Sequence, residues 1–349
     1  MFFELSPLDG LYFGKGHPFS AGFESVGRGM YPPPPSVFYG AFATYYLSLN
    51  GNNEQNLRFI EKNLRIKGVY FKRGETWHVL APFDLVKSAE DERELELLKM
   101  RKPVVFTDID GELNLLYSLY NTENVAGLIT DLDMCFYLKG KKDRFLYQDL
   151  SDFIVEESKI GIKMDYKKGS AKEGYLYRMS YIRMQKDIKN TAKFVVDVEC
   201  DGFEFPSSGL LKLGGEAKAA KVERSEDMPE FLKESFNAKI SEAIKSKRRF
   251  KLVLNTPSFF NKGWEPDLSR FGVKVKLLAA ALGKPVSIGG WDMKANEPKV
   301  MARAVPAGSV YYYEILDGNV DDLLEEIYKN GISDARSNEG FGRCFVGVI

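Results

Sequence analysis

Asn319-Val-Asp-Asp-Leu-Leu-Glu-Glu-Ile-Tyr-Lys-Asn330 predicts a helix, because Asn319 is a good N-cap and two aspartates follow it in the first turn. Gly331 is the residue type that most often ends a helix. The chain continues as Gly331-Ile-Ser-Asp-Ala-Arg-Ser-Asn-Glu-Gly-Phe-Gly-Arg343 and Cys344-Phe-Val-Gly-Val-Ile349. The last part is short, apolar and β-prone, so residues 345–349 are predicted to form an interior strand.

The loop between this helix and this strand has the composition of an anion site. Gly340 and Gly342 permit tight backbone turns and close approach of a ligand, and clustered backbone N–H groups bind anions. Arg336 and Arg343 beside them suit phosphate groups. The same residues also fit a tight helix-to-strand turn with solvated arginines, so the loop alone leaves both interpretations open.

Length and composition indicate a folded chain of about two domains, since it has 349 residues and 44% hydrophobic content. Lys and Arg number 49, as do Asp and Glu. A nucleic-acid surface would therefore be a local basic patch, and protein partners could cover other faces.

The cysteines Cys135, Cys200 and Cys344 are far apart and lack metal-ligand spacing, which favours a reducing cytoplasm and no disulfide framework. The first residues have no basic segment of the kind that begins a signal peptide. No run of about 18 apolar residues is present, so no membrane association is expected.

A second candidate anion site lies near the N-terminus. Residues 14–22 form a glycine-rich loop that contains His17, and Arg28 follows. Ser36 is predicted to be the N-cap of an apolar helix that extends to about Ser48. Because a helix N-terminus favours negative charge, His17, Arg28 and Ser36 are candidate anion-binding residues.

Residues 157–183 predict a long β-hairpin with a basic tip. Lys163, Lys168, Arg178 and Arg183 alternate there with several tyrosines. Cations for phosphates and aromatic rings for bases are what single-stranded nucleic acid requires. A solvated hairpin whose tyrosines pack on a core explains the same pattern equally well.

The rest of the chain predicts an α+β protein. Leu210 to Val222 forms a second glycine loop, flanked by Lys212 and Lys218, that leads into a strand. An amphipathic helix is predicted at 229–249 and several strands between 250 and 315. This order suggests two βαββαβ-like units with a boundary near 225–250 and large insertions between about 50 and 200.

Common catalytic and cofactor motifs are missing. The sequence has no Gly-x-x-x-x-Gly-Lys-Ser/Thr loop, no His-Glu-x-x-His and no Gly-x-Ser-x-Gly elbow, so no cofactor and no metal site are predicted. Only two histidines occur, and His17 could act as a general acid or base. A role in hydrogen bonding or phosphate contact is more common for a histidine in a glycine loop.

Several segments resemble the RAMP superfamily of CRISPR proteins, and within it subunit three of the type III-B Cmr complex. The similar segments, in chain order, are Gly14-Lys-Gly-His-Pro-Phe through Gly22, Met30-Tyr-Pro-Pro-Pro-Pro-Ser-Val-Phe-Tyr-Gly-Ala-Phe42, Glu157 with Gly161-Ile162 through Gly174-Tyr-Leu-Tyr177, Leu213-Gly-Gly-Glu-Ala-Lys218, Ile288-Gly-Gly-Trp291 and Gly340-Phe-Gly-Arg343. Family members often carry arginine where this chain has Gly14 and His17.

The resemblance implies two ferredoxin-like (RRM-like) domains, at 1–225 and 250–349, joined by a helix at 226–249, with the central hairpin as a thumb. It implies a noncatalytic subunit that binds crRNA and caps its 5′ tag, next to the large palm-domain subunit and an adjacent backbone RAMP subunit. The expected RNA-binding residues are those named above: His17, Arg28, Ser36, Lys163, Lys168, Arg178, Arg183, Lys212, Lys218, Arg336, Gly340, Gly342 and Arg343.

Three alternatives remain at this point. A metal-independent endoribonuclease that processes crRNA precursors would use His17. The equivalent subunit of a type III-A complex would differ only in its partners. A scaffold without RNA contacts would use none of the candidate residues.

Overall fold

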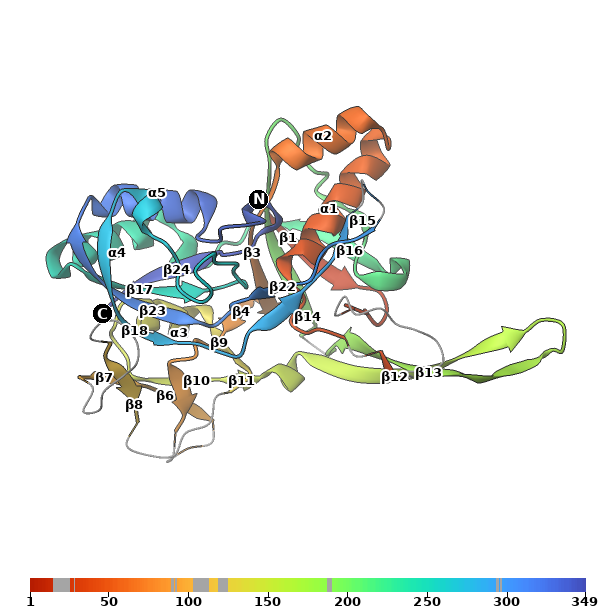
Figure 1. Cartoon of the computed structure of the whole chain (residues 1–349), viewed down its shortest axis with the longest axis horizontal. Helices are drawn as coiled ribbons and strands as arrows, with labels where there is room; N and C mark the ends of the chain where they lie inside the picture. Colours follow the sequence, from red (N-terminus) through yellow and green to blue (C-terminus); the bar gives the residue numbers. More distant parts are fainter. Residues whose placement is uncertain are drawn as a thin grey trace.

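The computed structural model describes residues 1–14, 26–27, 29–88, 91, 93–102, 113–118, 125–186, 190–292, 295 and 297–349. Helices and mostly antiparallel sheets make up this part of the chain, which confirms the α+β class (Figure 1). The site residues His17 and Arg28 lie outside the described residues.

The larger sheet is built mainly from the N-terminal half. Its strands lie in the order β11 (Gln148–Asp149), β9 (Gly127–Thr130), β4 (Thr76–Leu80), β3 (Leu64–Arg73), β14 (Ala192–Cys200), β1 (Phe2–Pro7), β16 (Ala219–Ser225) and β15 (Ser208–Lys212). Each strand pairs antiparallel with its neighbours.

This sheet is buried on both faces. Alternate residues of a strand point to opposite sides, so strand β1 contributes to two different cores. In β1, Phe3 and Leu5 belong to the core under helices α1 (Pro35–Asn50) and α2 (Glu54–Asn63). Phe2 belongs to a second core, shared with the C-terminal half. The C-terminal half therefore packs against the sheet face opposite α1.

The smaller sheet comes from the C-terminal half. Its strands lie in the order β18 (Lys274–Ala281), β23 (Val310–Asp317), β17 (Arg249–Leu254) and β24 (Cys344–Val348), again all antiparallel. Helices α4 (Glu234–Lys247) and α5 (Val320–Asn330) contribute to its core. The predicted terminal helix is confirmed, since the Asn319 side chain accepts a hydrogen bond from the Asp321 N–H at 2.9 Å.

The prediction that residues 345–349 form an interior strand is wrong in one respect. Strand β24 is fully buried, yet it lies at the edge of its sheet. Helix α3 (Asp131–Leu138) packs against this strand: a Cβ on Gly347 would lie 2.9 Å from the Leu138 carbonyl oxygen. A covered edge needs the same apolar residues as an interior strand, so the sequence pattern does not separate the two.

Two predicted helix starts are corrected. Helix α1 begins at Pro35, with Pro34 as N-cap and no side-chain cap, so Ser36 lies inside the first turn. Proline favours the first helical position because it needs no N–H partner there. The predicted helix at 229–249 divides into a 3₁₀ turn (Glu230–Leu232) and α4, because Lys233 between them is extended.

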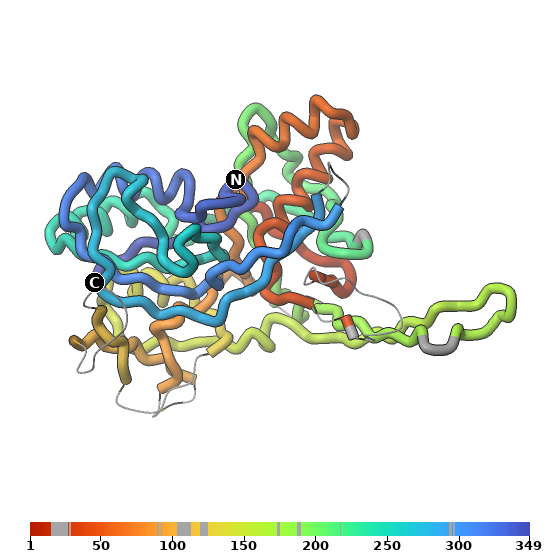
Figure 2. The backbone as a smooth tube through the Cα atoms, viewed as in Figure 1, coloured from red at the N-terminus to blue at the C-terminus, as the bar shows by residue number. Residues whose placement is uncertain are grey.

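Two long β-ribbons leave the sheets. Strands β12 (Ile154–Asp165) and β13 (Ser170–Met184) form the predicted hairpin, which projects from the body of the molecule (Figures 1 and 2). A second ribbon, at 286–304, consists of β19 (Val286–Ile288) paired with β22 (Ala302–Ala304) and β20 (Trp291–Asp292) paired with β21 (Glu297–Pro298). It runs from the C-terminal half toward α1 (Figure 2).

The remaining strands are short: β2 (Val26–Gly27), β5 (Leu85–Lys87), β6 (Glu94–Leu97), β7 (Lys99–Arg101), β8 (Leu115–Tyr117) and β10 (Arg144–Leu146). Within the described ranges, every helix is too short or too polar to cross a membrane.

Candidate nucleic-acid interface

A groove of about 960 Å³ lies where the two halves and the second ribbon meet. Its walls come from segments far apart in the sequence: Tyr12 to Gly14, α1, α2, the glycine loop after β15, the ribbon around Trp291, and the loop before β24. Three predicted site residues, Ser36, Lys212 and Arg336, line it together. The structure thus joins three candidate patches that the sequence places separately.

Arg336 anchors the ribbon to the last loop. Its guanidinium pairs with Glu339 at 2.7 Å and donates to the Gly289 carbonyl at 3.1 Å. Lys299 of the ribbon also pairs with Glu339, at 2.9 Å. Burial would raise the pKa of Glu339, but the two cations outweigh it and lower the pKa. Much of the charge of Arg336 is therefore balanced within the protein.

Lys212 differs from Arg336 in that its charge is not paired with a carboxylate of the described residues. It is exposed at the end of β15, and no carboxylate lies within 4.0 Å of its ammonium among the described residues. Of the predicted cations that line the groove, Lys212 is the better placed to contact a phosphate.

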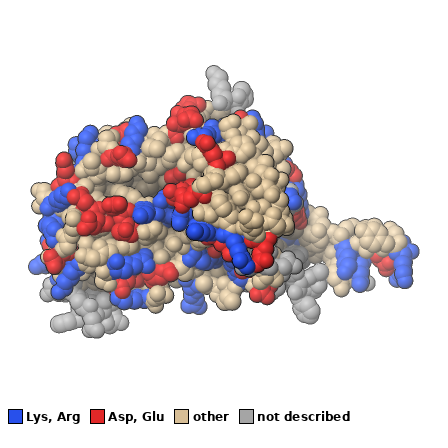
Figure 3. Space-filling model, turned by 90° about the horizontal axis from the view of Figure 1, so that it is seen from above, with Lys and Arg blue, Asp and Glu red and all other residues tan. Residues whose placement is uncertain are grey.

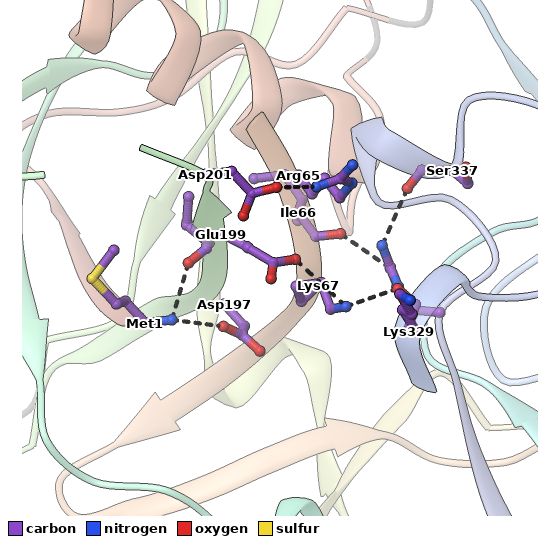
Figure 4. Close-up of polar contacts among 11 residues, drawn as sticks. Met1, Arg65, Ile66, Lys67, Asp197, Glu199, Asp201, Lys329 and Ser337 are labelled. Atoms are coloured by element: carbon purple, nitrogen blue, oxygen red, sulfur yellow. Dashed lines mark hydrogen bonds and ion pairs between the residues drawn. The ribbon is translucent and has the colours of Figure 1, made fainter. Parts of the chain in front are cut away.

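Arg343 is not at the surface. Its side chain is 5% exposed, and it donates to the carbonyls of Ile66, Lys329 and Ser337 at 3.1, 3.0 and 3.4 Å. Figure 4 shows Ile66 and Lys67 on β3 facing Lys329 and Ser337 of the C-terminal half. The geometry gives Arg343 a structural role at the seam between the halves, and Arg343 does not line the groove.

The backbone conformation and packing at positions 340 and 342 also require glycine. Both have positive φ, at 94° and 72°. A Cβ at Gly340 would lie 2.9 Å from the Ile66 side chain, and one at Gly342 would collide with the backbone of Ser333. Close packing at the seam accounts for both glycines without a ligand.

The base of the projecting hairpin gathers two other predicted residues. Arg183 pairs with Glu157 at 2.8 Å, and Lys218 pairs with Asp9 at 3.2 Å. Lys159 lies 3.8 Å from the same Asp9 and 4.7 Å from the Tyr181 ring centre. These contacts join the hairpin to the glycine loop after β15, and they balance part of the positive charge there.

Farther out, the hairpin has two chemically different faces. The cationic face carries Lys159, Lys163, Lys172, Tyr175, Tyr177 and Tyr181. The ammonium groups of Lys163 and Lys172 lie 5.1 and 4.8 Å from the Tyr175 ring centre. The apolar face carries Ile160, Ile162 and Leu176, all exposed. Figure 3 shows Lys and Arg side chains along the projecting hairpin.

The predicted hairpin residues divide between these surfaces. Lys163 lies on the cationic face, whereas Arg178 is paired with Ile160 and so lies on the apolar face. Lys168 is exposed in the turn at the tip, where its N–H bonds to Asp165.

The second histidine, His78, is buried. His78 is 1% exposed, and its Nδ1 lies 3.0 Å from the Thr76 carbonyl oxygen. Burial lowers its pKa to about 4, so it is neutral near pH 7. Within the described residues, no group of three His, Cys, Asp or Glu side chains is placed to hold a metal ion.

The family model for "CRISPR-associated protein (Cas_Cmr3)" matches residues 3–349. The chain belongs to the Cas_Cmr3 family. The resemblance to subunit three seen in the sequence motifs is thereby confirmed. No functionally curated protein matches the sequence.

Two solved structures resemble this Cas_Cmr3 chain in fold. One is a chain of the Type III-B Cmr-beta bound to cognate target RNA, with TM-score 0.53, 16% identity, and coverage of 89% of this chain and 86% of that chain. The other is a chain of the Type III-B Cmr-beta bound to cognate target RNA and AMPPnP, state 1, with TM-score 0.50, 15% identity, and coverage of 96% and 90%.

Two residues that line the groove of this Cas_Cmr3 chain, Trp291 and Lys299, were not among the predicted site residues. Trp291 stands in the Ile288-Gly-Gly-Trp291 segment that carries part of the family resemblance. A tryptophan directly after two glycines was the available signal. Lys299 had no distinguishing pattern around it.

Proposed function

We propose that this chain is a noncatalytic crRNA-binding subunit of a type III-B CRISPR effector complex in the cytoplasm. In this role it caps the 5′ tag of the crRNA, next to the large palm-domain subunit and an adjacent backbone RAMP subunit. The family membership and the likeness to Cmr-beta chains over most of their length support this assignment.

The strand orders support two ferredoxin-like domains. A βαββαβ unit has its four strands in the spatial order 4-1-3-2. The order β16-β1-β14-β3 in the larger sheet and the order β24-β17-β23-β18 in the smaller sheet both follow this rule. In each half one connecting helix is replaced by a glycine loop or an irregular segment. Helix α4 packs with the C-terminal sheet, which favours assigning the linker to that domain.

The cationic face of the projecting hairpin is the observation that carries the RNA-binding role. Lysines beside tyrosine rings offer phosphates a charge and bases a stacking surface, as single-stranded RNA requires. Lys163, Lys168 and Lys172 are the proposed phosphate contacts there, and Lys212 is the proposed contact in the groove.

The apolar face of the same hairpin supports the protein partner. Ile160, Ile162 and Leu176 are 63%, 51% and 59% exposed and adjoin one another across the two strands. Exposed apolar side chains that gather on one face mark an interaction surface. We assign this face to the adjacent backbone subunit.

The salt dependence of RNA binding tests the assignment. The full chain is titrated with single-stranded tag RNA over a range of salt concentrations, as wild type and as Lys163→Ala/Lys172→Ala. Each lost phosphate contact should reduce the slope of log K against log[salt] by about 0.7. The matched control is Lys274→Ala/Lys276→Ala, two exposed lysines on β18.

An unchanged slope in the hairpin variant, or an equal reduction in the control, contradicts the assignment. The endoribonuclease alternative is tested with the same protein. Specific cleavage of repeat RNA that His17→Ala abolishes would replace the noncatalytic role with an enzymatic one.

A further inference from the structure

Trp291 exposes an indole at the groove. The side chain is 54% exposed, at the point where the second ribbon reaches the glycine loop after β15. The chain has three tryptophans; Trp77 is buried, and Trp264 is half-buried and lies parallel to the Tyr311 ring. A large aromatic side chain left in solvent beside a concave surface indicates a ligand with a flat apolar face.

Gly40 is a second, independent feature of the same groove. It lies inside helix α1, where glycine is among the poorest helix formers. Its φ is not positive, and apart from its chain neighbours and the backbone of its own helix, no described atom lies within 4 Å of the position that a Cβ would occupy. Neither backbone conformation nor packing in the described residues explains the glycine. A group that enters the groove and approaches the helix closely does explain it.

The charge of the groove indicates what kind of group this is. Among the described residues, its lining contains as many carboxylates as cations: Glu61, Asp292 and Glu339 against Lys212, Lys299 and Arg336. A surface that binds only phosphates carries an excess of positive charge. An aromatic ring with polar groups of both signs suits a neutral planar heterocycle that offers donors and acceptors at its edge.

From these observations we infer that the groove holds one unpaired nucleobase of the bound RNA, stacked on Trp291 and approaching α1 at Gly40. The inference rests on the proposed function and adds a binding site for one base, here called the base seat, that is separate from the hairpin. A free nucleotide has the same chemistry, so the test includes adenosine monophosphate.

The intrinsic fluorescence of the full chain tests the stacking. Wild type is titrated with single-stranded tag RNA, and a stacked base should quench the Trp291 emission. Trp291→Phe should keep the affinity and lose the quench. Trp291→Ala should bind roughly 5- to 150-fold more weakly, the range expected for loss of one base–aromatic stack. Val300→Ala, an exposed position of the same ribbon outside the groove, is the control.

Variants at Gly40 test the base seat without changing an aromatic residue. Gly40→Ala should raise the urea midpoint of unfolding, because alanine is the better helix former, and yet weaken RNA binding. Gly40→Leu should weaken binding further. Ser48→Ala, an exposed position of the same helix, should leave binding unchanged.

The outcomes separate this inference from the proposed function. If Trp291→Ala and Gly40→Leu bind tag RNA as tightly as wild type while the hairpin lysine variant binds more weakly, the base seat is wrong and the RNA-binding role stands. If adenosine monophosphate binds as tightly as the RNA, the seat belongs to a free nucleotide. A wild-type chain that binds no tag RNA, alone or in the assembled complex, contradicts both.

Discussion

Arg343 donates a hydrogen bond from its Nε to the carbonyl oxygen of Ile66 at 3.1 Å, which joins the loop before the last strand to the sheet of the N-terminal half. The same guanidinium bonds to the carbonyls of Lys329 at the end of α5 and of Ser337 in a 3₁₀ turn (Ser337–Glu339). A single buried cation thus ties three segments together. Its surroundings match those of a structural arginine, in which every nitrogen has a carbonyl partner.

Replacing Arg343 with alanine should therefore destabilise the protein. The substitution removes three hydrogen bonds at the seam, of which the one to Ile66 is buried, and we expect a loss of roughly 2–4 kcal/mol in the free energy of unfolding. Urea denaturation measures it. The salt slope of RNA binding by the folded variant should equal that of wild type. A stable variant with a reduced slope would show instead that Arg343 contacts phosphate.

Gly342→Ala should be costly for a different reason. The residue has a φ of 72°, and an added Cβ would meet the Ser333 backbone. Positive φ and a backbone collision together should cost roughly 2 kcal/mol or more. Gly169→Ala, at a φ of 62° in the hairpin turn with open space around it, isolates the backbone component. Equal losses in the two variants would contradict the packing explanation.

The apolar face of the hairpin should matter for assembly and not for stability. Ile160→Ser/Leu176→Ser changes exposed side chains, so the free energy of unfolding should shift by less than about 0.5 kcal/mol per site. Incorporation into the reconstituted effector complex should fall roughly 10-fold or more, because the buried apolar contact is lost. Leu210→Ser, exposed on β15, is the control. Normal incorporation of the double variant would remove this face from the interface.

His78 should contribute to acid sensitivity. Burial, aided by the charge of Arg73 and opposed by the Thr76 carbonyl, lowers its pKa to about 4, below the unfolded value of about 6.5. The unfolded chain therefore binds a proton that the folded chain does not, and stability falls as the pH decreases from about 6.5 to 4. The effect is roughly 3 kcal/mol. His78→Gln should lose less stability over this interval, as measured by urea unfolding at several pH values; equal losses would contradict it.

The sequence predicted those elements that local patterns determine. The caps of α5 and the hairpin at 157–183 both follow from residues close together in the chain. The edge position of β24 could not be predicted from local patterns, because its burial by α3 requires a contact between distant segments. The strand order of either sheet is likewise a long-range property.

The candidate site shows the same division. Residue type and spacing selected Lys163 and Lys212, which lie on exposed surfaces. The same criteria selected Arg343, which is buried. An arginine beside glycines has the same sequence pattern whether it contacts phosphate or has a structural role. The hydrogen bond to the Ile66 carbonyl, which is distant in sequence, identifies the structural role of Arg343. The groove itself combines six segments and has no local signature.

Ultraviolet crosslinking of the assembled complex, with mass spectrometry of the crRNA-linked peptides, tests the central claim most directly. We predict crosslinks from the 5′ tag to peptides that contain Tyr175, Lys212 or Trp291. Crosslinks confined to other parts of the chain would contradict the proposed surfaces. A chain that copurifies with the complex and never crosslinks to the tag would contradict the capping role and indicate a scaffold.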